Sequence, residues 1–180
     1  MKLHLGCGNI IIPNFINVDI TPLPGVDVVD DVSTLTKFES NSVELIYACH
    51  VLEHFGHEEI LPILKRWWDV LKSGGELRIS VPDLDRIVKI YYDNWEHFQT
   101  VPNTPWIGLI YVGQGTPYDY HKTGFNNCYL SHLLRQARFQ EITEYPHSPH
   151  WLGISDASLA NQPFDSYISL NMRAIKWLPF

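Results

Sequence analysis

The sequence predicts an α/β fold in which a mostly parallel sheet carries helices on both faces. Short apolar runs typical of buried strands alternate with longer segments whose apolar residues recur at helical spacing. A glycine or a polar residue directly follows several of these strands, as at Gly6, Asp19 and Asp83. Ligands of open parallel sheets bind beyond the carboxyl ends of the strands, so these positions also predict a ligand site at that edge.

Composition limits the classes of protein to consider. The 180 residues suffice for a single domain spanning residues 1–180, and 45% apolar with 18% charged residues is ordinary for a globular protein. No apolar run is long enough to span a membrane, and a net charge of −7 without a Lys/Arg cluster argues against a nucleic-acid partner. Three scattered cysteines, and a first strand with no secretory leader before it, indicate a cytoplasmic protein with reduced thiols.

The start of the chain contains the most informative local pattern. A strand at residues 2–5 leads into Gly6-Cys7-Gly8, and the next strand, residues 15–18, ends in Asp19. Glycine lets a ligand approach the backbone, and a carboxylate can accept hydrogen bonds from both hydroxyls of a ribose. A dinucleotide site would have a third glycine and an acid about 20 residues further on. The short connection, interrupted by Pro13, instead favours a cofactor with a ribose and no phosphate, such as S-adenosylmethionine; a tight turn without a ligand is the alternative.

Periodicity predicts the remaining elements. The first helix has its apolar face between residues 60 and 71, tolerates Pro62 only in its first turn, and is ended by Ser73-Gly74-Gly75. Another helix is expected at residues 129–137. The later strands are expected at residues 26–29, 43–47, 76–81, 139–145 and 167–175. A helix after the fifth strand should bury one face formed by Leu84, Ile87, Val88, Tyr91, Trp95 and Phe98.

Two irregular excursions, at about residues 100–123 and 147–162, are rich in proline, glycine and aromatic residues. Loops of this length are commonly functional, so both are expected to cover the site.

Six segments stand out together in the first half of the chain. They are Leu5-Gly6-Cys7-Gly8, Asn17-Val18-Asp19-Ile20, Asp31, Val51-Leu52-Glu53-His54, Leu71-Lys72-Ser73-Gly74-Gly75 and Ile79-Ser80-Val81-Pro82-Asp83. As a set, in this order and spacing, they resemble the motifs of class I S-adenosylmethionine-dependent methyltransferases. In the second half, residues 125–139 resemble only in outline the late helix and sixth strand of that family.

The resemblance implies a single-domain, Rossmann-like class I methyltransferase fold, with a seven-stranded, mostly parallel sheet whose last strand is antiparallel. It is strongest to small methyltransferase-like proteins with a shortened first helix, often associated with glycan metabolism, which implies a small-molecule or saccharide acceptor. Many relatives carry an extra N-terminal helix over the substrate. Here the two excursions, or the other subunit of a homodimer, would have to provide that cover.

By resemblance, S-adenosylmethionine would bind at the strand ends. Gly6 and Gly8 would let the backbone approach the methionine and ribose moieties, and Asp19 would accept hydrogen bonds from both ribose hydroxyls. Asp31, or its neighbour Asp30, would accept from the adenine amine, although Asp31 is also placed to cap a turn. The residues expected beside the sulfonium and the methionine amino group are Ala48, Cys49 and His50.

The implied reaction is an in-line displacement at the sulfonium methyl group, which mainly requires a nucleophile held about 3 Å away. If the nucleophile is a hydroxyl, giving O-methylation, a general base within hydrogen-bond reach accelerates the step. The first candidates are His121, at the end of the first excursion, and Asp83, after the fifth strand; His54 and Glu53 follow. Each has a structural alternative: His121 as a half-polar surface residue and Asp83 as a helix cap.

Other interpretations stay open. His54-x-x-His57 and His147-x-x-His150 come without a cysteine or carboxylate set at ligand spacing, so no metal site is expected. The chain could be a methyltransferase-like binding or assembly protein without activity, or, less in keeping with its motifs, a nicotinamide-dependent oxidoreductase. Five aromatic residues either stack on a ring of the acceptor or pack the excursions onto the sheet: Trp106, Tyr111, Tyr118, Tyr120 and Trp151.

Overall fold

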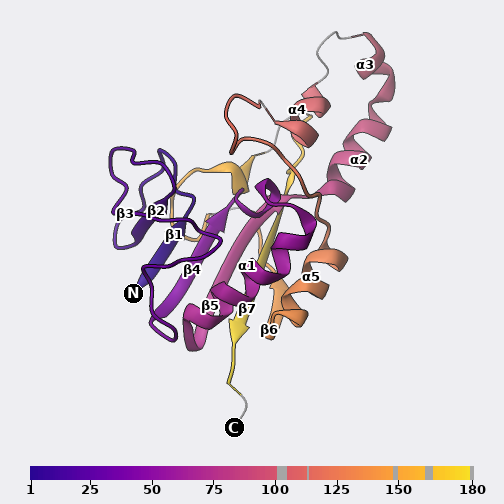
Figure 1. Cartoon of the computed structure of the whole chain (residues 1–180). Coiled ribbons are helices and arrows are strands. Elements are labelled where there is room, and N and C mark those ends of the chain that lie inside the picture. The colour runs from indigo at the N-terminus through magenta and orange to yellow at the C-terminus, as the bar shows by residue number, and fades with distance from the viewer. Residues whose placement is uncertain (101–104, 113, 148–149, 161–163, 179–180) are drawn as a thin grey trace.

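A computed structural model describes residues 1–100, 105–112, 114–147, 150–160 and 164–178, with only the backbone described at 105–107. Its centre is a seven-stranded sheet in the order β3-β2-β1-β4-β5-β7-β6 (Figure 1). The strands are β1 (Lys2–Leu5), β2 (Ile16–Asp19), β3 (Val28–Val29), β4 (Val43–Cys49), β5 (Leu71–Pro82), β6 (Phe139–Glu144) and β7 (Ser169–Lys176). Neighbours among β1 to β5 pair in parallel, whereas β7 pairs antiparallel with both β5 and β6.

This arrangement confirms the expected Rossmann-like methyltransferase fold with its antiparallel last strand. Every expected strand is present, and the strand expected at residues 76–81 reaches back to Leu71, which pairs with Val43 before a bulge. The glycines in Ser73-Gly74-Gly75 therefore lie within β5 and do not end the preceding helix, which stops at Val70.

Helices α1 (His57–Val70) and α5 (Asn127–Gln136) pack on one face of the sheet (Figure 1). Their apolar stripes and that face of β4 form the main core, which includes Ile46, Ala48, Trp67 and Leu134. Trp67 is fully buried and its indole Nε1 donates to the Val32 carbonyl at 2.8 Å. Burying this large ring anchors α1, because aromatic side chains contribute much of the energy of a core.

The opposite face of β4 is covered by loops, so the expectation of helices on both faces is wrong for the described residues. Tyr47 packs there against Ile12 and Phe15, from the connection between β1 and β2, and against Trp151. That connection is too short, and too interrupted by Pro13, to contain a packed helix. The second excursion adds only the short 3₁₀ turn η2 (Ala157–Leu159).

The start of α1 differs from the expectation that Pro62 lies in the first turn of this helix. Residues 51–55 contain a 3₁₀ turn, η1 (Leu52–His54), and α1 itself begins only at His57. Pro62 consequently lies in the second turn of α1 and not in the first, where it removes one backbone N–H from the helix ladder. The apolar stripe still places Ile60 and Leu64 in the core, and tertiary packing of that stripe outweighs the missing bond.

The helix after β5 is divided in two. α2 (Leu84–Asp93) and α3 (Trp95–Thr100) meet at Asn94, and α4 (Pro105–Tyr111) occupies part of an excursion expected to be irregular (Figure 1). The buried face differs from the expected one: Val88 in α2 and Trp95 just after the break are each 54% exposed, whereas Ile90 is buried. None of the helices in the described parts of the chain is long and apolar enough to cross a membrane.

Candidate functional site

The structure gathers the sequence-predicted positions at one edge of the sheet. Gly6 and Gly8 follow β1, Asp19 ends β2, His50 follows β4 and Asp83 follows β5. These strands are parallel, so their carboxyl ends face the same way. The expected placement is therefore confirmed, while the role of each residue depends on its own contacts.

The two glycines of the first turn are required for different reasons. Both lie in the left-handed region, with φ of +61° at Gly6 and +51° at Gly8. A Cβ on Gly6 would lie 2.5 Å from Cγ2 of Val51, so packing excludes a side chain there. A Cβ on Gly8 would meet no atom within 4 Å, which leaves open space beside the backbone where a ligand can approach.

Asp19 is held in place by this turn. Its Oδ2 accepts a hydrogen bond of 2.9 Å from the Gly8 N–H, and its Oδ1 accepts one of 2.8 Å from the Thr21 N–H. A carboxylate has about four acceptor sites, so each oxygen keeps a lone pair after these bonds. Asp19 is only half-buried and its oriented carboxylate could therefore receive a pair of vicinal hydroxyls.

The two adjacent acids after β3, Asp30 and Asp31, make different contacts. Asp30 is buried, and its carboxylate accepts hydrogen bonds from Thr36 Oγ1 at 2.9 Å and from the Lys37 N–H at 3.0 Å, which fixes the following loop. Asp31 is exposed and caps a turn by accepting from the Ser33 N–H at 2.8 Å. Asp31, and not Asp30, is thus the acid with acceptor capacity open to solvent.

The end of β4 supplies three neighbouring positions of different character. Ala48 is fully buried in the main core, so only its backbone faces the strand ends. Burial raises the pKa of the Cys49 thiol, which therefore stays protonated. His50 has a φ of +53°, and its Nε2 lies 2.8 Å from Ser169 Oγ while its Nδ1 faces Glu53 Oε1 at 3.2 Å.

Glu53 is the centre of a histidine cluster. Its side chain is fully buried, yet neither carboxylate oxygen has a hydrogen-bond partner in the part of the chain that is described. Besides His50, His121 faces it, with Nε2 3.8 Å from Oε1. The Glu53 carbonyl accepts hydrogen bonds from the Lys122 and Thr123 N–H groups, at 2.8 and 3.2 Å, and so joins the His121 segment to η1.

His121 is largely buried and its pKa is lowered, because desolvation disfavours the imidazolium more than the negative charge of Glu53 favours it. It also hydrogen-bonds to the Ile110 backbone and packs edge-on against His54, with the ring centroids 5.1 Å apart. His121 is therefore a neutral imidazole at pH 7, the protonation state that a general base needs.

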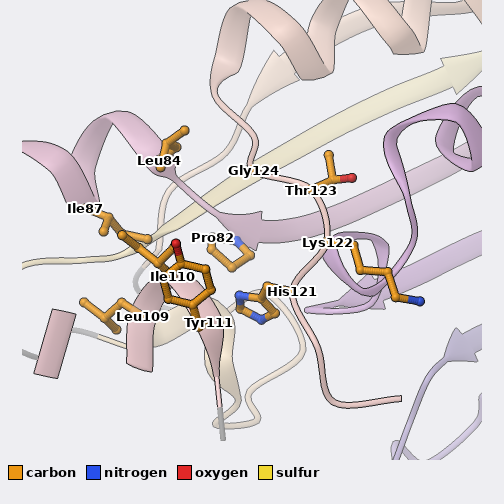
Figure 2. A pocket seen from close by; sticks show the side chains of 10 residues that line it. All are labelled: Pro82, Leu84, Ile87, Leu109, Ile110, Tyr111, His121, Lys122, Thr123 and Gly124. Carbon is orange, nitrogen blue, oxygen red and sulfur yellow. The ribbon is translucent and has the colours of Figure 1, made fainter. Parts of the chain in front are cut away.

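A cavity of about 180 Å³ opens beside His121 (Figure 2). Its walls come from α2, α4, the end of β5 and the end of the first excursion, and most of them are apolar. Leu109, Ile110 and Tyr111, which belong to the excursion expected to cover the site, form one wall of this cavity. The other lining residues are Pro82, Leu84, Ile87, His121, Lys122, Thr123 and Gly124.

Asp83 shows the contacts of a helix cap. Its Oδ1 accepts from the Asp85 N–H at 3.1 Å, and its Oδ2 pairs with Arg86 Nε at 2.7 Å. Its carboxylate is buried and both oxygens are engaged. A catalytic role for Asp83 remains a prediction.

The structure does not bring the five predicted aromatic residues together. Tyr111 lines the cavity, while Tyr118 and Tyr120 are exposed at 62% and 41%. Trp151 lies on the loop-covered face of the sheet, where it packs on Tyr47 and under the Arg78 guanidinium. The side chain of Trp106 lies outside the described residues.

Sequence reasoning missed a buried network on the loop-covered face. The Tyr47 hydroxyl donates to Asp156 Oδ2 at 2.5 Å, and His150 Nε2 lies 3.4 Å from the same oxygen. Burial raises the pKa of Tyr47, so the phenol remains a donor. The network fixes the second excursion to β4. The only signal for it in the sequence is the presence of His150 and Asp156 in a segment otherwise rich in apolar residues.

Comparison with known proteins agrees with this architecture. Residues 3–79 match a family model described as a methyltransferase domain. An S-adenosylmethionine-dependent methyltransferase from Archaeoglobus fulgidus aligns with a TM-score of 0.61 at 16% identity, over 97% of this chain and 85% of that one. The 1,6-didemethyltoxoflavin-N1-methyltransferase of Burkholderia thailandensis, solved with S-adenosylhomocysteine, gives 0.57 at 16% identity over 98% and 71%.

A third similar structure, the CurJ carbon methyltransferase, gives a TM-score of 0.61 at 16% identity over 98% of this chain but 48% of its own, so this chain spans about half its length. A search of curated proteins gave no match. The methyltransferase-domain match covers residues 3–79, and the similar structures show that the chain has the fold of S-adenosylmethionine-dependent methyltransferases.

Proposed function

We propose that the protein transfers the methyl group of S-adenosylmethionine to a hydroxyl group of a small-molecule or saccharide acceptor. The observation that carries this proposal is the position of His121, a neutral buried imidazole that faces both Glu53 and an apolar cavity beyond the strand ends. Carbon and nitrogen methyltransferases are among the similar structures. The choice of an oxygen acceptor therefore rests on this candidate base.

The residues present fit the cofactor. The open space beside Gly8 would let the ligand lie against the backbone. Asp19 would offer its two oriented carboxylate oxygens to the vicinal hydroxyls of the ribose, and the exposed carboxylate of Asp31 would accept a hydrogen bond from the exocyclic amine. Bound there, S-adenosylmethionine supplies a methyl group activated by a positive sulfur. The backbone at residues 48–50 would flank its methionine part.

His121 would take the proton from the acceptor hydroxyl as the oxygen attacks. The imidazolium that forms would be stabilised by the adjacent Glu53 carboxylate and by the Ile110 backbone. The apolar walls of the cavity would exclude water from this step, which strengthens the electrostatic contacts within it. The cavity is smaller than the roughly 300–1,000 Å³ of a drug-sized site, so it suits only the reacting end of an acceptor.

Calorimetric titration with S-adenosylmethionine, S-adenosylhomocysteine and NAD tests the first step. We expect one adenosyl ligand to bind per chain and NAD not to bind. A folded protein that binds neither adenosyl ligand would refute the proposal, and NAD binding alone would favour an oxidoreductase. Adenosyl binding without turnover, in a screen of hydroxyl acceptors including saccharides, would favour a methyltransferase-like binding protein.

A further inference from the structure

Glu53, His54 and His121 form a compact group of metal-ligand side chains. One ligand atom from each lies within 4.8 Å of those of the other two. Glu53 and His54 come from η1, while His121 comes from the chain after α4, and backbone hydrogen bonds to the Glu53 carbonyl hold the two segments together. The grouping is therefore fixed by the fold and does not depend on a flexible surface.

Glu53 provides the second observation. A fully buried carboxylate whose oxygens lack hydrogen bonds is costly unless a positive charge compensates it. Two imidazoles face it without donating a hydrogen bond of good geometry, at 3.2 Å from His50 and 3.8 Å from His121. An unpaired acceptor aimed into a group of histidines is the arrangement expected where a cation belongs.

The hydrogen bond made by His54 selects its free nitrogen. His54 Nδ1 lies 3.3 Å from the Tyr120 carbonyl oxygen, which can only accept, so Nδ1 carries the proton. Nε2 is then left with a lone pair for a ligand bond. Metal-binding histidines are oriented in this way, with the second ring nitrogen donating to a carbonyl or a carboxylate.

We propose that Glu53, His54 and His121 bind a divalent first-row cation of the Zn²⁺ type. One carboxylate and two imidazoles suit such cations, and three protein ligands leave a coordination position open. Ligand atoms about 2 Å from Zn²⁺ lie roughly 3–4 Å from one another, so the spacing here needs only a small contraction. His121 also lines the cavity, so the open position would face it.

Binding of the cation is independent of methyl transfer, but its use rests on the proposed function. His121 would serve as the base only in metal-free protein, because a His121 that ligates the cation cannot also take a proton. In metal-bound protein the cation would lower the pKa of the acceptor hydroxyl, which would release its proton to solvent water before its oxygen attacks the methyl group. The site would thus select acceptors whose reacting hydroxyl can reach a metal ion.

Titration of metal-stripped protein with ZnCl₂ tests the site without cofactor or acceptor. We expect one Zn²⁺ per chain, and affinity about 10²-fold weaker, or lost, in Glu53→Gln and in His54→Ala. His57→Ala is the matched control, because His57 is exposed at the start of α1 and should leave affinity unchanged. With Co²⁺ as probe, the visible spectrum should show nitrogen and oxygen ligands and no thiolate band.

The melting temperature, measured with and without Zn²⁺, gives a second and independent readout of binding. Zn²⁺ should raise the melting temperature of the parent and of His57→Ala but not of Glu53→Gln, whose neutral amide preserves side-chain volume. The proposal would be overturned if the parent does not bind Zn²⁺, or if both site variants bind it with the affinity of the parent. S-Adenosylhomocysteine binding by metal-stripped protein is measured in parallel, so failure of the metal site and failure of the proposed function give different results.

Discussion

Replacing Asp19 by alanine gives the most direct test of the cofactor site. The carboxylate already accepts one backbone N–H on each oxygen, at 2.9 and 2.8 Å, and would accept one ribose hydroxyl on each as well. Hydrogen bonds to a charged group contribute about 1.5–3 kcal/mol each. Losing one such bond predicts binding at least about tenfold weaker, and losing both predicts binding at least about 10²-fold weaker.

The assay is calorimetric titration with S-adenosylhomocysteine, together with thermal melting to confirm that each variant is folded. Asp93→Ala is a suitable control, because Asp93 is an exposed acid on α2 that pairs with Lys89 at 2.6 Å. Asp19→Asn should lie between the parent and Asp19→Ala, since the amide oxygen keeps part of the acceptor capacity. A folded Asp19→Ala variant with the affinity of the parent would show that the carboxylate only braces the turn.

Four further outcomes follow from the same geometry. Gly8→Val should abolish S-adenosylhomocysteine binding while the protein stays folded. Gly6→Ala should instead lower the free energy of unfolding by about 1–3 kcal/mol, because the new Cβ would overlap Val51. Denaturant unfolding and ligand titration of both variants distinguish these two effects. His121→Ala should reduce turnover by about 10²-fold at unchanged cofactor affinity, and full turnover would remove it as the base. Because burial lowers the pKa of His121, the acid limb of turnover against pH should lie below pH 6.5, and a limb above that value would contradict the neutral imidazole.

Local pattern was enough to predict the sheet. Each strand is a short apolar run, and strand boundaries follow from the glycines and acids that end them, as at Gly6 and Asp19. The cover of the second sheet face was not predictable in this way. It depends on Tyr47 meeting Trp151 and Asp156, residues distant in the chain whose contact no periodicity encodes.

The helix after β5 shows the same limit on a smaller scale. Amphipathic spacing correctly predicted that residues 84–98 are helical, but a single uninterrupted helix was assumed. The break at Asn94 changes the phase of the stripe after it, so Trp95, expected on the buried face, is 54% exposed, while Phe98 stays buried. A single interruption of a helix can therefore misplace a position that follows it.

In the candidate site, too, contacts between residues close in the chain are easier to predict than contacts between distant segments. Gly8 and Asp19 are close in the chain and their bond could be anticipated from a strand-turn-strand pattern, whereas Glu53 and His121 meet only because two separate segments fold against each other. Glu53 directly follows the buried residues Val51 and Leu52 and is itself fully buried. The sequence does not indicate which group compensates the charge of its carboxylate. Either neighbouring groups of the protein or a bound cation can do so, and the two differ in one consequence. Compensation by the protein's own groups needs no added ligand, so Zn²⁺ would leave stability unchanged; a cation site predicts stabilisation that Glu53→Gln removes.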